Sequence, residues 1–280
     1  MSVTLGADPE MFVADEQGMV RAVCGKLGGT KGAALDIGEG VGLQEDNVMV
    51  EYNIAPQTSA RHFALAIETA RTRVMDFVRT KMGQNYTAST VCTAEFPAEE
   101  LASKQAMVFG CSPDFDAYAK GAAAPPVDRD TLVTPAGAYR FAGGHVHIGY
   151  ENPNKVPDFV VTALCDATMG LSSILDRDEQ GMRRWLYGAA GRYRPTDYGI
   201  EYRVLSNYWT FSAERAYAVG LHAQLVGETI ERADPEELQH FYKQVPWDAV
   251  AATINTENRT NASRLWRYIQ SDLKMEDLIP

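Results

Sequence analysis

Cysteine is scarce in this sequence, and its spacing fits no metal-binding or redox motif. The 280 residues include 4 cysteines, Cys24, Cys92, Cys111 and Cys165, and no two of them form a Cys-x-x-Cys pair. A zinc ribbon and a thioredoxin-type motif are therefore excluded. We expect the cysteines to behave as small apolar side chains in a reducing compartment.

Long apolar runs and a signal peptide are also missing. Residues 1–8 lack the basic start and the apolar stretch of a secretory signal. No run approaches the roughly 20 apolar residues that a membrane-spanning helix needs. We therefore expect a cytoplasmic protein without a membrane partner.

Clusters of basic residues are absent as well, and the formal net charge is −11 with a sequence pI of about 5.0. Because Lys and Arg clusters hold the phosphate backbone of nucleic acids, we expect no nucleic-acid partner. The hydrophobic content of 45% and the charged content of 22% are those of a folded globular protein. A chain of this length can bury the core of one large domain.

Two histidines one residue apart are the most informative feature that is present. His145 and His147 lie in the segment Gly143–Gly149. We predict this segment to be an extended strand, in which residues i and i+2 point to the same face. Both imidazoles then face one way, while Val146 and Ile148 face the core.

Three other segments show the same alternation, with polar side chains on one face and apolar ones on the other. The polar pairs are Asp8 and Glu10 on entry to a strand over 11–13, Glu51 and Asn53 in 48–54, and Glu201 and Arg203 in 200–204. Four short strands are thus each predicted to offer two functional groups on one face.

An ordinary antiparallel sheet with one wet face also alternates in this way, so one such strand would indicate only a solvent-facing surface. These four strands differ in residue type, since they carry carboxylates, imidazoles and a guanidinium rather than Thr, Ser or Lys. Carboxylates with an imidazole suit Mg²⁺ or Mn²⁺ bound for phosphate chemistry. An arginine beside them suits a transferring phosphoryl group.

The rest of the chain is predicted to supply helices and loops. Apolar residues at helical spacing predict a helix that begins after Thr58 or Ser59 and ends at about Met82. Residues 97–138 have no strong period, and we expect a loop excursion that covers a site. The other predicted elements are a hairpin over 11–14 and 19–23, a turn at 44–47, a strand over 88–96, helices over 158–176 and 212–232, and short helices over the remainder.

Two segments leave alternatives open. The glycine-rich segment Gly25–Gly32 lacks Walker A spacing, and it is either a flexible loop or a lid whose Lys26 or Lys31 touches a substrate. The segment 183–194 carries four arginines, Arg183, Arg184, Arg192 and Arg194. They form either a surface of arginines with buried aliphatic stems or a clamp for a triphosphate.

The strand pairs, in their order and spacing, resemble the glutamine synthetase and glutamate-cysteine ligase superfamily of ATP-dependent carboxylate-amine ligases. Segments 6–10, 143–149 and 187–207 look like a phage-encoded branch of those ligases, and the resemblance spans about residues 5–210. It implies an α+β fold in which a curved antiparallel sheet holds the active site on its concave face and helices pack outside.

The resemblance also implies a role for each polar side chain. The implied metal ligands are Asp8, Glu10, Glu51, His145 and Glu201, with Glu45 or Asp46 as open candidates for a further ligand. The implied nucleotide contacts are Asn53, His147, Arg192, Arg194 and Arg203. Glu51 and Arg203 are the implied catalytic residues, and Arg203 would meet the transferring phosphoryl group. Asp8 stands where the superfamily usually has Glu.

Such a ligase transfers the γ-phosphoryl of ATP to a carboxylate, and an amine then attacks the acyl phosphate. The implied cofactors are ATP and Mg²⁺ or Mn²⁺, and the implied substrates are a small-molecule or peptide carboxylate and amine. We expect one catalytic domain over 1–280, with a pocket for the acceptor built by 97–138 and a helical appendage over about 233–280. A phage-encoded enzyme would act in the host cytoplasm. The oligomeric state is left open.

Two other functions use the same residue types. A metal-dependent hydrolase would place carboxylates and histidines around an activated water, although the arginine-rich segment argues against it. A non-catalytic phage accessory protein would keep the sheet for assembly, and the intact set of site residues argues against that.

Overall fold

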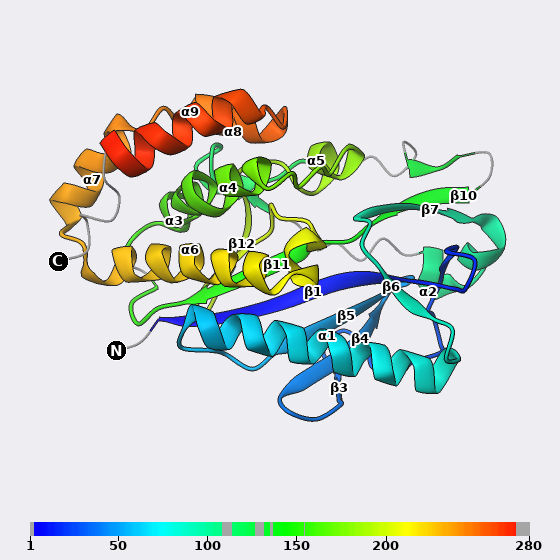
Figure 1. Ribbon diagram of the computed structural model, residues 1–280. Helices are drawn as coiled ribbons and strands as arrows, with labels where there is room; N and C mark the ends of the chain where they lie inside the picture. The colour runs from blue at the N-terminus through cyan, green and yellow to red at the C-terminus, as the bar shows by residue number, and fades with distance from the viewer. Residues whose placement is uncertain (1–2, 108–113, 127–131, 135–136, 154, 273–280) are drawn as a thin grey trace.

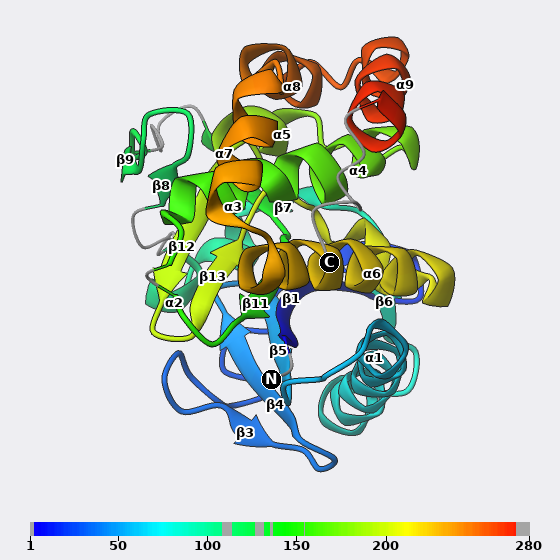
Figure 2. The same ribbon diagram turned by 90° about the vertical axis from the view of Figure 1, so that its left-hand side faces the viewer.

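The computed structural model describes residues 3–107, 114–126, 132–134, 137–153 and 155–272. Within these ranges a large antiparallel sheet is covered on one face by helices (Figures 1 and 2). The predicted combination of an antiparallel sheet with outer helices is therefore confirmed, and the described sheet is open rather than closed into a barrel. The closer likeness to glutamine synthetase stays a prediction.

The long strand β1 (Thr4–Ala14) lies at the centre of the sheet, and every strand pair is antiparallel. The main path runs β3 (Leu35–Asp36), β4 (Val41–Asp46), β5 (Met49–Ile54), β1, β11 (Gly144–Gly149), β13 (Gly199–Tyr202), β12 (Arg192–Thr196), β8 (Phe115–Asp116) and β9 (Ala122–Ala123). Two short strands, β2 (Val20–Arg21) and β6 (Thr87–Ser89), also pair with β1. A separate two-stranded sheet is formed by β7 (Thr93–Pro97) and β10 (Gly137–Phe141).

Alternation along β1 decides which face holds the core. Leu5, Ala7 and Met11 are buried, whereas Asp8 and Glu10 between them are only partly buried. The same alternation in β5 and β11 places apolar side chains on the helix-covered face. Because the strand begins at Thr4 rather than near residue 11, Asp8 and Glu10 lie inside it and not on entry to it. Their orientation is therefore fixed by pairing on both sides.

Two long helices, α1 (Ala60–Met82) and α6 (Ala213–Arg232), lie side by side across the apolar face of the sheet (Figure 1). The hydroxyl of Ser59 accepts a hydrogen bond from the amide of His62 and so begins α1, while Gly83 ends it with a φ of 128°. The hydroxyl of Ser212 caps α6 in the same way. Both predicted helices are confirmed, and of the two candidates Thr58 and Ser59 it is Ser59 that caps α1.

A third helical stretch covers β12 and β13. It consists of α3 (Asp158–Cys165), one turn of π-helix (Asp166–Gly170) and α4 (Leu171–Leu175). By length and composition Asp158–Leu175 could cross a membrane, but 72% of it is buried inside the protein, as in a core helix. The C-terminal helices, drawn in orange and red in Figure 1, are α7 (Pro235–Gln244), α8 (Trp247–Asn255), α9 (Arg259–Arg267) and a second π-turn (Tyr268–Asp272). Of these, α8 and α9 contact this stretch.

Several predicted elements differ from the structure. Residues 44–46 belong to β4 rather than to a turn, and the reversal to β5 occurs at Asn47, whose φ is 62°. The predicted strand 88–96 is two strands, β6 and β7, in different sheets. The described parts of 97–138 contain regular elements, because β8 and β9 extend the main sheet and β10 pairs with β7. The short helices there and elsewhere are Ala98–Leu101, α2 (Lys104–Met107), α5 (Met182–Leu186) and Asn207–Phe211.

Candidate active site

The strand register places the predicted polar side chains on the face opposite to the helices. The directly paired positions are Asp8 with His145, His147 with Glu201, Glu10 with Glu51, and Arg194 with Glu201. Directly paired residues of antiparallel strands share a face. Five neighbouring strands thus contribute to one polar surface, and Asn53 joins it two residues beyond Glu51.

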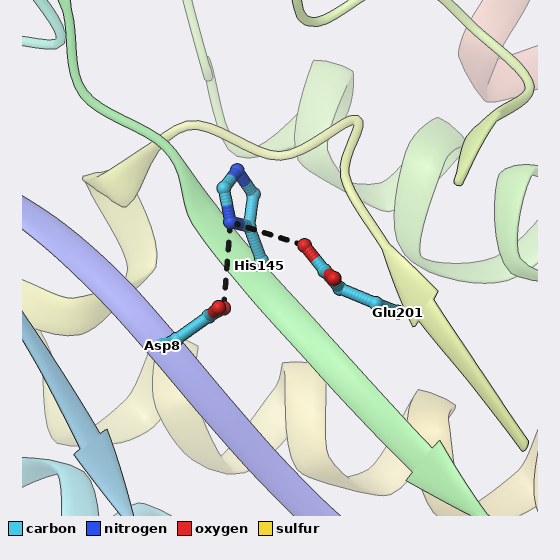
Figure 3. A group of neighbouring side chains, drawn as sticks. All are labelled: Asp8, His145 and Glu201. Atoms are coloured by element: carbon cyan, nitrogen blue, oxygen red, sulfur yellow. Dashed lines mark ion pairs between the residues drawn. The ribbon is translucent and has the colours of Figure 1, made fainter. Parts of the chain in front are cut away.

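Asp8, His145 and Glu201 form the first cluster on this surface (Figure 3). The Nδ1 atom of His145 lies 3.4 Å from Oδ1 of Asp8 and 3.6 Å from Oε1 of Glu201. Oδ1 of Asp8 is buried, and both imidazoles of β11 lie within 3.4 Å of it. Two carboxylates with one imidazole fit a divalent ion in that place.

Glu10, Asp46 and Glu51 form a second cluster, in which one oxygen from each lies within 4.8 Å of the others. Burial and the charges of Asp8, Glu10 and Asp46 raise the pKa of Glu51 to about 9. Burial and the charge of Glu10 raise the pKa of Asp46 to about 6. Carboxylates that repel one another in this way gain from a bound cation, so this cluster also fits a divalent ion.

The structure separates the two open candidates beside Glu51. Asp46 points to the second cluster, whereas the neighbouring Glu45 points to the opposite face of β4. The Glu45 carboxylate accepts hydrogen bonds from the amides of Gly25 and Leu27, both at 2.7 Å, and of Gly28 at 2.8 Å. Glu45 therefore anchors the glycine-rich loop. Asp46 is the remaining candidate for a further metal ligand.

The glycine-rich loop itself offers one lysine toward the site. Nζ of Lys26 donates to the carbonyl of Ala22 at 2.7 Å and is thereby occupied in the loop. Lys31 is exposed, and its charge acts to lower the pKa of Asp46. Of the two lysines, Lys31 is therefore the one whose charge acts on the second carboxylate cluster.

His147 is held between a carboxylate and a tyrosine. Its Nε2 lies 3.1 Å from Oδ1 of Asp8, and its Nδ1 lies 2.5 Å from the hydroxyl of Tyr198. Burial acts to lower the pKa of His147, but the charge of Asp8 outweighs it and the pKa is raised. Burial acts to raise the pKa of Asp8, but His147 and His145 outweigh it and the pKa is lowered. Asp8 is therefore ionised at neutral pH.

Three arginines border the clusters on the side of β12 and β13. Arg203 contacts Oε1 of Glu201, and its Nη1 lies 3.2 Å from Nδ1 of His145. Nη1 of Arg194 lies 3.1 Å from Oε2 of Glu201. Burial acts to raise the pKa of Glu201, but Arg203 and other cations outweigh it and the pKa is lowered.

Arg192 completes this border. Its nearest carboxylate oxygen, on Asp116, is 3.9 Å from Nη1. The buried Nε and Nη1 atoms of Arg192 lack hydrogen-bond acceptors among the described residues, as does Nε of Arg194. Buried donors without acceptors mark a place where an anion would be bound well.

Arg183 and Arg184 bind main-chain carbonyls next to this border, and the clamp of four arginines stays a prediction. Nη1 of Arg184 donates to the carbonyl of Gly188 at 2.7 Å, and Nη2 of Arg183 donates to the carbonyl of Arg203 at 3.3 Å. Both side chains are almost fully buried. They connect the segment after β13 to α5, and Arg183 also lines a cavity beside Glu10 and His145.

A cavity opens on each side of the clusters. The larger, of about 480 Å³, is lined by residues that include Asp8, Glu51, Asn53, His147 and Tyr198. Its volume lies within the range of about 300–1,000 Å³ that is usual for small-molecule sites. The smaller, of about 50 Å³, lies beside Glu10, Asp46, His145 and Arg203, with Arg140 and Tyr187 in its wall.

Sequence reasoning missed four side chains at this site. Gln44 donates to Oε2 of Glu51 at 2.7 Å, and Tyr198 contacts His147. Asp114 lies against Arg203, and Arg140 lines the smaller cavity. Alternation within β4 would have placed Gln44 and Asp46 on the face of Glu51. Tyr198, Asp114 and Arg140 lie in loops or in the separate sheet, where no periodic pattern indicates them.

Comparison with protein families gives one match, over residues 122–275, to the model of the phage phiEco32-like COOH-NH2 ligase, type 2. The matched residues make up more than half of the chain and include both histidines of β11 and the arginines of β12. The chain belongs to this family. The resemblance to a phage-type carboxylate-amine ligase is thereby confirmed. A comparison with curated proteins found no match. Four carboxylates of the site lie before the matched region of this ligase family, namely Asp8, Glu10, Asp46 and Glu51. Their assignment to the site rests on the geometry alone.

Proposed function

We propose that the protein is an ATP- and divalent-metal-dependent ligase that joins a carboxylate to an amine through an acyl phosphate. Membership of the carboxylate-amine ligase family supports the bond that is formed. The two carboxylate clusters with arginines along one border support the use of ATP and metal. The reaction would take place in the host cytoplasm, where ATP is available.

The residues present fit two divalent ions. Asp8, His145 and Glu201 would hold one, and Glu10, Asp46 and Glu51 the other. Mg²⁺ or Mn²⁺ bound there would bridge phosphate oxygens and offset their charge. Without such ions, the pKa of about 9 at Glu51 shows how strongly the carboxylates resist sharing the site.

The side chains around the clusters would divide the remaining work. The larger cavity would receive the nucleotide, with His147 and Asn53 toward its phosphates. Arg192 and Arg194 would bind phosphate oxygens with their buried donors. Arg203, which lies nearest to His145 and Glu201, would meet the charge on the phosphoryl group as it moves to the carboxylate. Glu51 belongs to the second cluster and lies two residues before Asn53. It would hold the second ion close to the reacting carboxylate.

One observation carries this proposal: the pairing of β5, β1, β11, β13 and β12 brings carboxylates, imidazoles and guanidiniums into one row. A hydrolytic metal site needs an ion and a water, but it does not need arginine donors beside them. Phosphoryl transfer needs both the metal ion and the arginine donors. The substrates would be a small-molecule or peptide carboxylate and amine, with the carboxylate on the side of the smaller cavity.

The test is ADP release by the purified protein with ATP, Mg²⁺ or Mn²⁺, and panels of carboxylates and amines, with products identified by mass spectrometry. We expect ADP release to require the metal and a carboxylate, and the condensed product to require an amine. Glu201→Gln should abolish both, whereas Glu68→Gln, an exposed position on α1, should change neither. Hydrolysis of a substrate without ATP would refute the ligase, and so would a protein that binds no nucleotide.

A further inference from the structure

A buried carboxylate outside the active site connects the segments that carry its arginines. Asp166 opens the single π-turn within the helical stretch 158–175, and its side chain is fully buried. π-Turns inside α-helices are uncommon and often lie near functional sites. Among the described residues, Asp166 takes part in no ion pair, and neither carboxylate cluster includes it.

Three hydrogen bonds converge on this carboxylate. Oδ1 accepts from the hydroxyl of Tyr202 at 2.6 Å. Oδ2 accepts from the hydroxyl of Tyr118 at 2.8 Å and from the amide of Gly191 at 2.7 Å. All three donors come from chain segments remote in sequence from the helix. The bond lengths are those of charge-assisted hydrogen bonds, which are stronger than neutral ones.

Two of the donors directly adjoin a residue of the arginine border in sequence, and the third lies near a carboxylate beside that border. Tyr202 lies between Glu201 and Arg203 on β13, with its side chain on the opposite face of the sheet. Gly191 directly precedes Arg192 at the start of β12. Tyr118 follows Asp116, the carboxylate nearest to Arg192, by two residues. The Asp166 carboxylate lies on one side of the sheet, and the guanidiniums lie on the other. Its hydrogen bonds therefore hold in place the backbone segments that carry those guanidiniums.

The space around Asp166 is too tight for this arrangement to shift freely. A methyl group added at Gly170, one turn along the helix, would lie 2.9 Å from the hydroxyl of Tyr202 and 2.7 Å from a methyl carbon of Ile254. Close packing of this kind transmits a displacement instead of absorbing it. A change at Asp166 would consequently move Tyr202 and, with it, Arg203.

We infer that Asp166 is a positioning residue, which holds Arg192 and Arg203 in place for phosphate through its hydrogen bonds to Gly191, Tyr118 and Tyr202. The inference rests on the proposed function, because it assigns these arginines to phosphate. It names a residue that touches neither substrate nor metal ligand and that acts through the backbone of β12 and β13.

Holding a carboxylate there costs stability, which provides a test. Burial raises the pKa of Asp166 to about 7 even though the two tyrosines, the Gly191 amide and Arg184 favour its charged form. Cys165, its neighbour on the helix, has a raised pKa and stays neutral. A raised pKa means that stability is fully present below the unfolded value of 3.8 and is lost as pH rises through about 7. A residue kept for packing alone would not be expected to carry this cost.

Asp166→Asn removes the charge and keeps the size of the side chain. Relative to the unchanged protein, its melting temperature should rise progressively between pH 4 and pH 8, because only the unchanged protein carries the loss of stability that Asp166 causes over this range. At pH 8 its turnover should nevertheless fall by about 10²-fold, the loss that a displacement near 1 Å can cause. Stability and activity would then change in opposite directions, which loss of folding could not produce.

Tyr202→Phe is the second variant, and it removes only the hydroxyl that contacts Oδ1. We expect a loss of turnover at pH 8, and a double variant with Asp166→Asn should lose little more than the single one. The matched control is Tyr150→Phe, since the hydroxyl of Tyr150 is buried and has no hydrogen-bond partner in the described chain. Unchanged turnover in both Asp166→Asn and Tyr202→Phe would overturn the inference.

A binding measurement separates this inference from the proposed function. Calorimetry with pyrophosphate and the metal-free protein at pH 8 reports on the guanidiniums without any turnover. We expect affinity to fall by about tenfold or more in Asp166→Asn and Tyr202→Phe, and to be kept in Tyr150→Phe. If the unchanged protein binds pyrophosphate but makes no ADP, the ligase is refuted while Asp166 is still tested. Equal affinity in all variants, or no binding by any of them, overturns the role of Asp166, whereas the ligase is tested separately by ADP release.

Discussion

Oδ1 of Asp114 lies 2.9 Å from Nε of Arg203 and 3.6 Å from Nη2 of Arg194. Asp114 belongs to neither carboxylate cluster, and only about 10% of its side chain is exposed. Its carboxylate thus lies against two of the three guanidiniums that border the site. An anionic ligand that approaches these arginines meets a carboxylate of the protein already in contact with them.

Asp114→Asn is therefore expected to bind ADP with Mg²⁺ more tightly than the unchanged protein. The amide keeps the shape but no longer competes with phosphate for the guanidiniums, and a tenfold change in affinity corresponds to about 1.4 kcal/mol. Calorimetric titration would measure the difference, with Asp234→Asn on the exposed start of α7 as the control. Weaker binding in the variant would instead mean that Asp114 holds the arginines in position for the nucleotide.

Metal-free protein should lose stability as the pH is raised, because of Glu51. Burial and the charges of Asp8, Glu10 and Asp46 raise the pKa of Glu51 from 4.5 to about 9. The stability that Glu51 contributes is therefore fully present below pH 4.5 and is lost as the pH rises through 9. Asp46 adds to the loss up to about pH 6. Asp8 has a lowered pKa and changes its charge only at more acidic pH.

The measurement is the melting temperature at pH 5, 7 and 9 with EDTA and with Mg²⁺. Glu51→Gln should show a shallower decline than the unchanged protein in EDTA, and Mg²⁺ should stabilise the unchanged protein more than the variant. Glu68→Gln serves as the exposed control. If the melting temperature falls with pH in parallel for all three proteins in EDTA, the neighbouring carboxylates do not repel the Glu51 carboxylate.

His145→Ala should lower metal affinity while the metal-free protein keeps its fold. His145 is buried, but its Nδ1 faces Asp8, Glu201 and Arg203 rather than apolar side chains. Removing a ligand of this kind typically costs metal affinity more than packing. Mn²⁺ titration followed by calorimetry, beside melting in EDTA, measures the two effects separately. A fall in the metal-free melting temperature as large as that of a core variant would indicate that His145 is a packing residue.

The strand faces could be predicted from the sequence because one face of each strand must be buried. Leu5, Ala7 and Met11 recur with period two, and this recurrence alone orients Asp8 and Glu10. The start of α1 was predictable for a similar reason, since the end of a helix needs a local hydrogen-bond partner such as Ser59. Strand faces and helix ends were therefore predictable because they depend on residues close together in the sequence.

Side chains whose partners are distant main-chain groups could not be predicted in this way. Glu45 faces away from the clusters because it binds amides of a loop about twenty residues earlier. Arg184 is buried because it binds carbonyls that include that of Val204. In the sequence these residues look like their neighbours Asp46 and Arg192, which do face the site. Nothing in the sequence distinguishes Asp166 within the predicted helix over 158–176, because its three donors come from other segments.

Arg203 is distinguished from the other arginines by its place between the first cluster and Asp114. It contacts Glu201 and lies 3.2 Å from His145, so its guanidinium is the one closest to where a phosphoryl group would move. Arg192 and Arg194 lie one strand further out and, in the proposed function, would bind the resting nucleotide. Nucleotide binding and phosphoryl transfer should therefore respond differently to changes at these positions.

Arg203→Lys keeps the positive charge but loses the planar fork. We expect ATP affinity to change little, because Arg192 and Arg194 remain. Turnover at saturating ATP should fall by about 10² to 10³, the usual loss when one donor to a transition state is removed. Affinity and the rate of ADP formation would be measured with the same carboxylate and amine, and Arg61→Lys on the exposed face of α1 provides the control. If binding collapses while the rate at saturating ATP survives, Arg203 binds the ground state, and its assignment to the moving phosphoryl group is wrong.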